Sequence, residues 1–170
     1  MAETPEVVSN TMPLDGFGRI SKLWILRELY GKVYVPTIVL DELRESRAWG
    51  QIEGSDWIVV LTPNENQLAA AERMAHSLLE EFEELDEENA LIIALAKACG
   101  AKKFLTNDRA GVEAARSIGL KPIWISGVVL EAYQKHIIKD VGSVLNELRA
   151  SGVWISDQVY QRVLEKARGS

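Results

Sequence analysis

Short apolar runs alternate along the chain with longer segments in which apolar residues recur at helical spacing. The helical periodicity is clearest over residues 67–82 and 89–99, and Gly100 follows the second segment where helices commonly end. The expected strands lie at residues 7–8, 33–36, 57–61, 103–106 and 122–125. Short strands that alternate with helices predict a three-layer α/β/α fold around a mostly parallel sheet of four to five strands.

Polar residues and prolines mark the junctions between these elements. After the first strand, residues 9–11 read as a polar turn, and Pro13 prevents the strand from continuing. Helical spacing resumes over residues 20–29, and Gly31 follows at the C-terminal end. For three later helices the predicted N-caps are Thr37, Asp86 (or a neighbour) and Ser126.

The last part of the chain departs from the alternating pattern. Two further helices are expected at residues 141–148 and 157–167. A chain of 170 residues fits one compact domain. We therefore predict a single domain over residues 1–170, in which residues 139–168 form a helical C-terminal extension.

Composition narrows the class of protein. Apolar residues make up 47% of the chain and charged residues 26%, which is ordinary for a globular protein. The longest apolar runs fall far short of the ~20 residues that a membrane span needs, and the N-terminal residues lack the apolar segment of a secretory signal. The single cysteine, Cys99, fits a reducing compartment and a buried structural role. We expect a cytoplasmic protein with no membrane partner.

The net charge of −6 bears on nucleic-acid binding in two ways. It argues mildly against a broad nucleic-acid surface, because phosphate contacts need Lys and Arg. A carboxylate cluster that holds a divalent cation, however, contributes negative charge itself, and the bound cation reverses the local sign. The charge is therefore compatible with a nuclease.

Other kinds of catalytic or binding site find little support in the sequence. Gly16 and Gly18 lack the third glycine and the strand–helix context of a dinucleotide-binding loop. Neither His76 nor His136 has a metal-ligating partner at helical spacing. Carboxylates remain as the residues that could carry chemistry.

Several of these polar and acidic residues follow strands or open helices at one expected edge of the sheet. In open parallel α/β sheets, ligands bind beyond the carboxyl ends of the strands. A cluster of carboxylates there would resist ionisation unless a cation such as Mg²⁺ or Mn²⁺ were present. The candidates are Asn10 after the first strand, Asp41 and Glu42 after the second, Asp108 after the fourth, and Glu87 and Glu88 at the start of a buried helix.

Four segments resemble motifs of a known family. Residues 8–14 and 35–43 resemble the opening of a PIN domain, residues 85–96 its third acidic motif, and residues 105–109 its fourth. Residues 125–130 and the two-helix tail are similar to an uncharacterised prokaryotic subgroup of PIN-like proteins, related to VapC-toxin-like ribonucleases. The resemblance covers nearly the whole chain, and its specificity comes from four motifs in the right order.

The resemblance implies an endonuclease that hydrolyses single-stranded RNA with Mg²⁺ or Mn²⁺, often as the toxin of a toxin–antitoxin pair. By position, Glu42, Glu88 and Asp108 would be the acidic residues that act in catalysis and bind the metal. Thr11 and Asn107 would support them. An antitoxin protein would then be a partner.

The chain departs from the family at Asn10, where the family has an aspartate. The Asn10 carbonyl oxygen could still complete the metal and catalytic site, but the lost negative charge should weaken metal binding and activation of the nucleophile. Glu87 or Asp86 could also take the place of Glu88. Structural roles stay open for all of these residues, as turn formers, helix caps or partners of a helix dipole.

A second interpretation is a catalytically weak or inactive PIN-like module that binds RNA or a protein partner, and Asn10 and the acidic net charge favour it. The chain also has five tryptophans. We interpret them, led by Trp24, Trp57 and Trp124, as core or dimer contacts rather than base-stacking platforms, and they make a homodimer the expected assembly.

Overall fold

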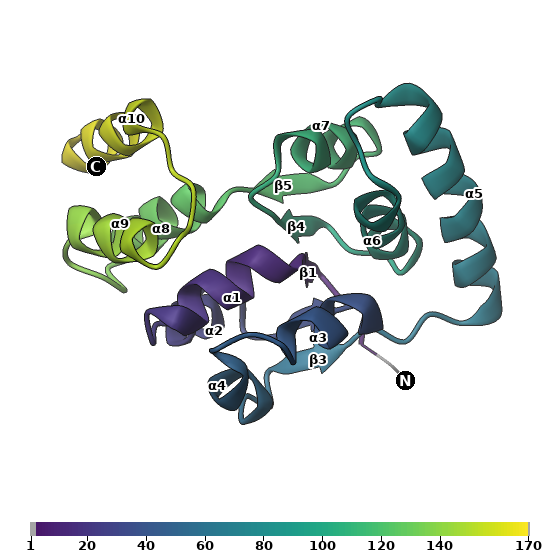
Figure 1. Ribbon diagram of the computed structural model, residues 1–170, viewed down its shortest axis with the longest axis horizontal. Coiled ribbons are helices and arrows are strands. Elements are labelled where there is room, and N and C mark those ends of the chain that lie inside the picture. Colours follow the sequence, from purple (N-terminus) through teal and green to yellow (C-terminus); the bar gives the residue numbers. More distant parts are fainter. Residues whose placement is uncertain (1–2, 170) are drawn as a thin grey trace.

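The computed structural model describes residues 3–169, in which five strands and ten helices form a layered α/β structure (Figure 1). The strands are β1 (Val7–Ser9), β2 (Val33–Val35), β3 (Ile58–Val60), β4 (Lys103–Leu105) and β5 (Lys121–Ile123). The helices are α1 (Thr11–Arg19), α2 (Trp24–Tyr30), α3 (Thr37–Leu43), α4 (Trp49–Glu53), α5 (Glu65–Glu81), α6 (Glu87–Ala98), α7 (Arg109–Ser117), α8 (Ile125–Gln134), α9 (Val141–Ala150) and α10 (Asp157–Arg168).

The sheet has the strand order β3-β2-β1-β4-β5, and every strand pair is parallel. Right-handed crossovers in this order place α1 to α4 on one face of the sheet and α5 to α7 on the other. The packing agrees with this arrangement, since α1 contacts α3 and α4, and α6 contacts α5 and α7. The predicted three-layer α/β/α fold with a parallel sheet is therefore confirmed.

The C-terminal helices α8, α9 and α10 pack against one another at one end of the molecule, opposite α5 (Figure 1). They also contact the rest of the fold, because α8 packs on α2 and α9 on α1. Within residues 3–169, no helix is both long and apolar enough to cross a membrane.

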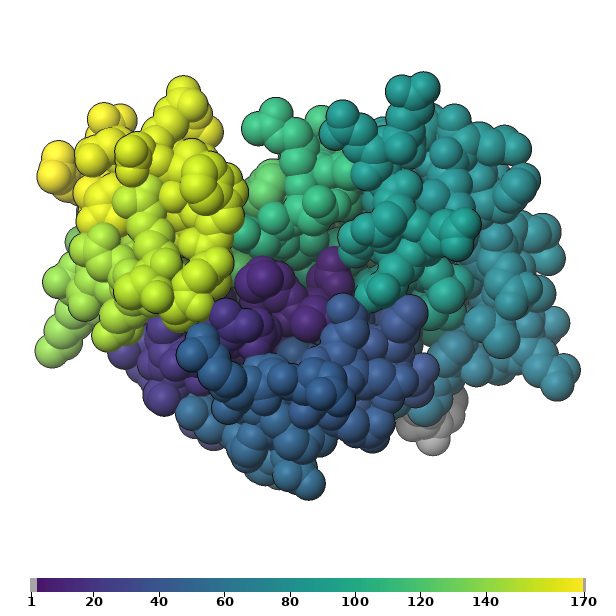
Figure 2. All heavy atoms as spheres, viewed as in Figure 1, coloured from purple at the N-terminus to yellow at the C-terminus, as the bar shows by residue number. Residues whose placement is uncertain are grey.

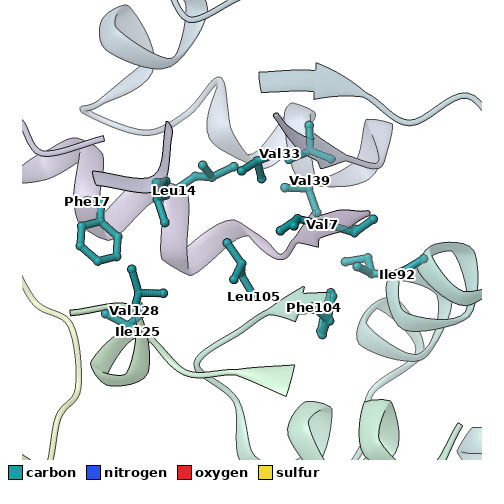
Figure 3. Close-up of a cluster of buried hydrophobic side chains, with 14 of the residues drawn as sticks. Val7, Leu14, Phe17, Val33, Val39, Ile92, Phe104, Leu105, Ile125 and Val128 are labelled. Atoms are coloured by element: carbon teal, nitrogen blue, oxygen red, sulfur yellow. The ribbon is translucent and has the colours of Figure 1, made fainter. Parts of the chain in front are cut away.

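A continuous apolar core joins the sheet to both helical layers and to the C-terminal helices. Val8 of β1 and Phe104 of β4 are fully buried at its centre. Figure 3 shows Phe17 of α1 pointing toward Ile125 and Val128 of α8, so the core extends beneath the C-terminal helices. The positions of β1 and β4, and of the residues that follow them, are consequently held by buried contacts on both sides.

One prediction about the N-terminal region was wrong. Residues after β1 form the helix α1 instead of a polar turn, because the Asn10 side chain caps that helix by accepting a hydrogen bond from the backbone N–H of Thr11. Pro13 lies in the first helical turn, where the missing N–H breaks no helical hydrogen bond. The helix predicted over residues 20–29 begins only at Trp24, and α4 was not predicted.

Two of the three predicted helix caps also differ from the structure. Thr37 is the first residue of α3, which follows Pro36, and Ser126 lies inside α8, which follows Trp124. Neither helix has a side-chain hydrogen bond at its N-cap. Asp86 is confirmed, since its carboxylate accepts a hydrogen bond from the backbone N–H of Asn89 at the start of α6.

Candidate active site

The strand order of the sheet reverses between β1 and β4, and this is where an open parallel sheet most readily binds a ligand. Asn10 follows β1, and its backbone N–H donates to the carbonyl oxygen of Leu105, the last residue of β4, at 2.9 Å. Asp108 lies three residues beyond Leu105. Asn10 and the segment that leads to Asp108 therefore leave the sheet from neighbouring strands at this point.

Asn10 is held in one orientation by two partners. Its Oδ1 accepts from the backbone N–H of Thr11 at 2.8 Å, and its Nδ2 donates to Oδ1 of Asn89 at 2.6 Å. Asn89 is oriented in turn, because its own Nδ2 donates to Oδ2 of Asp86 at 3.0 Å. The two amides thus meet with matched donor and acceptor, and a carboxylate at position 10 would instead face a carbonyl oxygen.

Thr11 connects this amide pair to the first acidic candidate. Its Oγ1 donates to Oε1 of Glu42 at 3.0 Å, across the space between the N-terminus of α1 and the last turn of α3. Asp41, the neighbouring candidate, is engaged elsewhere in an ion pair with Arg44 at 2.7 Å. Of these two acids, Glu42 is therefore the one that belongs to the site.

Glu42 and Glu88 form a close pair of carboxyl groups. The pKa of Glu88 is raised to about 7, first by the hydrogen bond that it makes with Glu42, then by partial burial and the negative charges of Glu42 and Asp86. Glu88 lies in the first turn of α6, and both side chains are accessible to solvent. A large share of Glu88 therefore keeps its proton near neutral pH, which relieves the repulsion between the two carboxyl groups.

This repulsion should appear as a pH-dependent effect on stability in the protein without metal. Because the folded-state pKa of Glu88 is raised above its unfolded value of 4.5, ionised Glu88 destabilises the fold above about pH 7, and the effect fades as pH falls toward 4.5. We expect Glu88→Gln to raise the free energy of unfolding at pH 8 by about 1 kcal/mol, a value reduced for solvent screening, with little change at pH 4.5. Urea denaturation at pH 8 and at pH 4.5 measures this change in the free energy of unfolding.

Glu87→Gln is the matched control, since it removes the same charge from the same helical turn and loses the same interaction with the helix dipole. The Glu87→Gln substitution should give no comparable gain in the free energy of unfolding at pH 8. Equal effects of the two substitutions at both pH values would contradict the proximity of Glu88 and Glu42.

Asp108 lies beyond β4 and caps α7. Its Oδ2 accepts from the backbone N–H of Gly111 at 2.8 Å, and its own N–H donates to Oγ1 of the fully buried Thr106 at 3.3 Å. Asn107 turns in another direction, where its Nδ2 donates to the backbone carbonyl of Trp154 at 3.1 Å. The Asp108 carboxylate is exposed and has a structural role that is independent of any metal.

The structure thus brings together some of the candidate site residues that were selected from the sequence. One chain of hydrogen bonds runs through Asp86, Asn89, Asn10, Thr11 and Glu42, and Glu88 lies beside Glu42. Across residues 3–169, no three Asp, Glu, His or Cys side chains are gathered closely enough to form a ready-made metal site, so Asp108 does not complete a triad with Glu42 and Glu88. Asn89 was missed in the sequence, where its spacing from Asp86 signals only the start of a helix.

The Glu42–Glu88 pair has the chemistry of a divalent-cation site. Two adjacent carboxyl groups offer the hard oxygen ligands that Mg²⁺ and Mn²⁺ prefer, and such ions commonly bind through one or two carboxylates while keeping several waters. A cation would also replace the proton of Glu88 as the means of relieving the repulsion. The residues present therefore fit such an ion at this pair.

A protein-family model described as a PIN domain matches residues 6–169, and the chain therefore belongs to the PIN-domain family. Proteins of this family are typically nucleases and generally use divalent metal ions. Membership thus indicates nuclease activity in general. A comparison with curated proteins finds no match.

Proposed function

We propose that the protein is an endonuclease that hydrolyses phosphodiester bonds of single-stranded RNA with the help of Mg²⁺ or Mn²⁺. The observation that supports this most strongly is the Glu42–Glu88 carboxyl pair, which lies at the carboxyl edge of the sheet and raises the pKa of Glu88 to about 7. The choice of RNA follows from the resemblance of the four sequence motifs. A role as the toxin of a toxin–antitoxin pair, with an antitoxin as partner, depends on this cleavage and is proposed with it.

The side chains of the site have separable roles in this proposal. Glu42 and Glu88 would hold the ion through their carboxylate oxygens, and Thr11 positions Glu42 by hydrogen bonding to Oε1. When bound, the ion supplies an activated water and stabilises the negative charge that develops on the phosphate. Asp108 borders the site from the adjacent strand, and Asn10 fixes the start of α1, which carries Thr11.

The direct test is incubation of the purified protein with end-labelled single-stranded RNA and Mn²⁺ or Mg²⁺. We expect cleavage that stops in EDTA and is much slower on duplex RNA. In the same assay Glu88→Gln should lose activity while the fold persists, because glutamine keeps the size of the side chain but removes one of the two carboxylates that would hold the ion. Cleavage that survives both EDTA and Glu88→Gln would point to a contaminating nuclease and contradict the proposal.

A catalytically weak module that binds RNA or a protein is the second candidate, and the Asn10–Asn89 amide pair favours it. Calorimetry with Mn²⁺ compares wild type with Asn10→Asp. The ribonuclease proposal expects wild type to bind Mn²⁺ and Asn10→Asp to bind it more tightly. In Asn10→Asp the added carboxylate faces Oδ1 of Asn89, and a bound cation would offset the repulsion between these two oxygen-bearing groups. No binding to wild type, with binding in Asn10→Asp, would support the weak module instead.

A further inference from the structure

A pocket of about 510 Å³ lies next to the candidate active site. Its walls come from three separate segments, namely the residues after β4, the first turns of α8, and residues 154–166, which include most of α10. Figure 2 shows the surface hollowed between the C-terminal residues (yellow) and the region of α7 (green), with N-terminal residues (purple) at its lower end. Asn107 and Arg109, which line the pocket, flank Asp108 in the sequence, so the pocket reaches the segment that borders the candidate site.

The charge of this pocket is opposite to that of the whole protein. Arg109, Arg162 and Lys166 line it, and no Asp or Glu is among the residues described at its walls, although the chain carries a net charge of −6. Arg109 and Arg162 form no ion pair with any residue in the range 3–169. Two arginines that form no such ion pair, on a concave surface, attract an anion with several charges.

The same pocket carries the most exposed large apolar side chain among the described residues. Trp154 is 81% exposed, which contradicts a core role for this tryptophan, whereas Trp57 is buried as predicted. The Trp154 backbone is nevertheless fixed: Asn107 donates to its carbonyl at 3.1 Å, and Nε of Arg149 donates to the carbonyl of Ile155 at 2.9 Å. Because Ile155 is also buried, the backbone that carries the exposed indole is fixed in place.

We propose that this pocket binds the stretch of single-stranded RNA that flanks the cleaved bond. One base stacks on the indole of Trp154, and neighbouring phosphates bind Arg109, Arg162 and Lys166. This inference rests on the proposed nuclease function and assigns the substrate-binding surface of that same site. An acidic protein segment would match the cations alone, whereas a single-stranded nucleic acid matches both the cations and the flat aromatic surface.

The test measures RNA binding without cleavage, by fluorescence anisotropy of a labelled single-stranded RNA of about ten nucleotides in EDTA. We expect Trp154→Ala to weaken binding about tenfold and Trp154→Tyr to restore most of the affinity, because tyrosine also stacks on bases. Arg162→Glu should weaken binding and lower the slope of log K against log salt by about one. Arg73→Glu on α5 is the matched control, since it makes the same charge change at the far end of the molecule (Figure 1).

The outcomes separate this proposal from the proposed function. RNA binding that depends on Trp154 and Arg162, in a protein that cleaves no RNA, would support the proposed RNA-binding surface. The same result would contradict the proposed nuclease activity. Cleavage with Mn²⁺ by a protein whose RNA affinity is unchanged in Trp154→Ala and Arg162→Glu would contradict the surface and leave the nuclease intact. Absence of RNA binding by wild type would also overturn the proposal, and an acidic protein partner would then fit the pocket better.

Discussion

Substitution Glu42→Gln is expected to lower the rate of single-stranded RNA cleavage about a hundredfold or more. Glu42 is the residue that the structure ties to both halves of the site, through the Thr11 hydroxyl at 3.0 Å and through the carboxyl of Glu88. Glutamine keeps the size of the side chain and can still hydrogen-bond, but it removes a negative charge that would stabilise a bound divalent cation. Loss of a partner that only orients a metal ligand typically costs 10- to 100-fold, so loss of a ligand should cost at least the upper end of that range.

The rate is measured with Mn²⁺ in excess on a single labelled RNA, and the melting temperature is recorded beside it. Glu45→Gln serves as the control, because Glu45 is also exposed and lies just after α3, yet takes no part in the hydrogen-bond network. We expect Glu45→Gln to retain near-wild-type cleavage. If Glu42→Gln cleaves as fast as Glu45→Gln, the acidic pair is not the catalytic centre.

Substitution Gly18→Ala is expected to destabilise the protein by roughly 2 kcal/mol, although alanine is the better helix former. Gly18 lies in α1, and a Cβ atom built there would be 2.6 Å from Cβ of Ala48. Both atoms are attached directly to backbone, so α1 or the segment before α4 would have to move. Since α1 begins next to Asn10 with Thr11, such a movement should also displace the Thr11–Glu42 contact and slow any cleavage.

Gly50→Ala is the matched control for this effect. A Cβ atom at Gly50, in α4, would meet no atom within 4 Å, so alanine should be neutral or stabilise the protein by up to about 1 kcal/mol. Urea denaturation of both variants gives the comparison. A Gly18→Ala variant as stable as Gly50→Ala would show that α1 is not packed against Ala48 as closely as the structure indicates.

The fold was largely predictable because its signals are local. Each short apolar run and each periodic segment appears in the sequence within a window of a few turns, and the strand and helix boundaries differ from prediction by a few residues. The helix α1 was missed for a physical reason: Pro13, Gly16 and Gly18 are poor helix formers, and tertiary contacts outweigh that weak propensity. In particular, Gly18 allows the close approach of Ala48.

The candidate site was predictable only in part. Glu42 and Glu88 could be selected because one lies in the short helix that follows the second strand and the other opens a buried helix. The partnership of Asn10 and Asn89 joins residues 79 positions apart, so no local pattern reveals it. The exposure of Trp154 was equally hidden, because a tryptophan between two apolar residues ordinarily reads as core.

The central claim is that the Glu42–Glu88 pair holds a divalent cation, and the most direct measurement is the anomalous difference density of a crystal soaked in Mn²⁺. The structure predicts a peak within coordination distance of a carboxylate oxygen from each of Glu42 and Glu88, and no such peak in Glu42→Gln. A soaked crystal with no peak at this pair, or with its peak on other residues, would contradict the account.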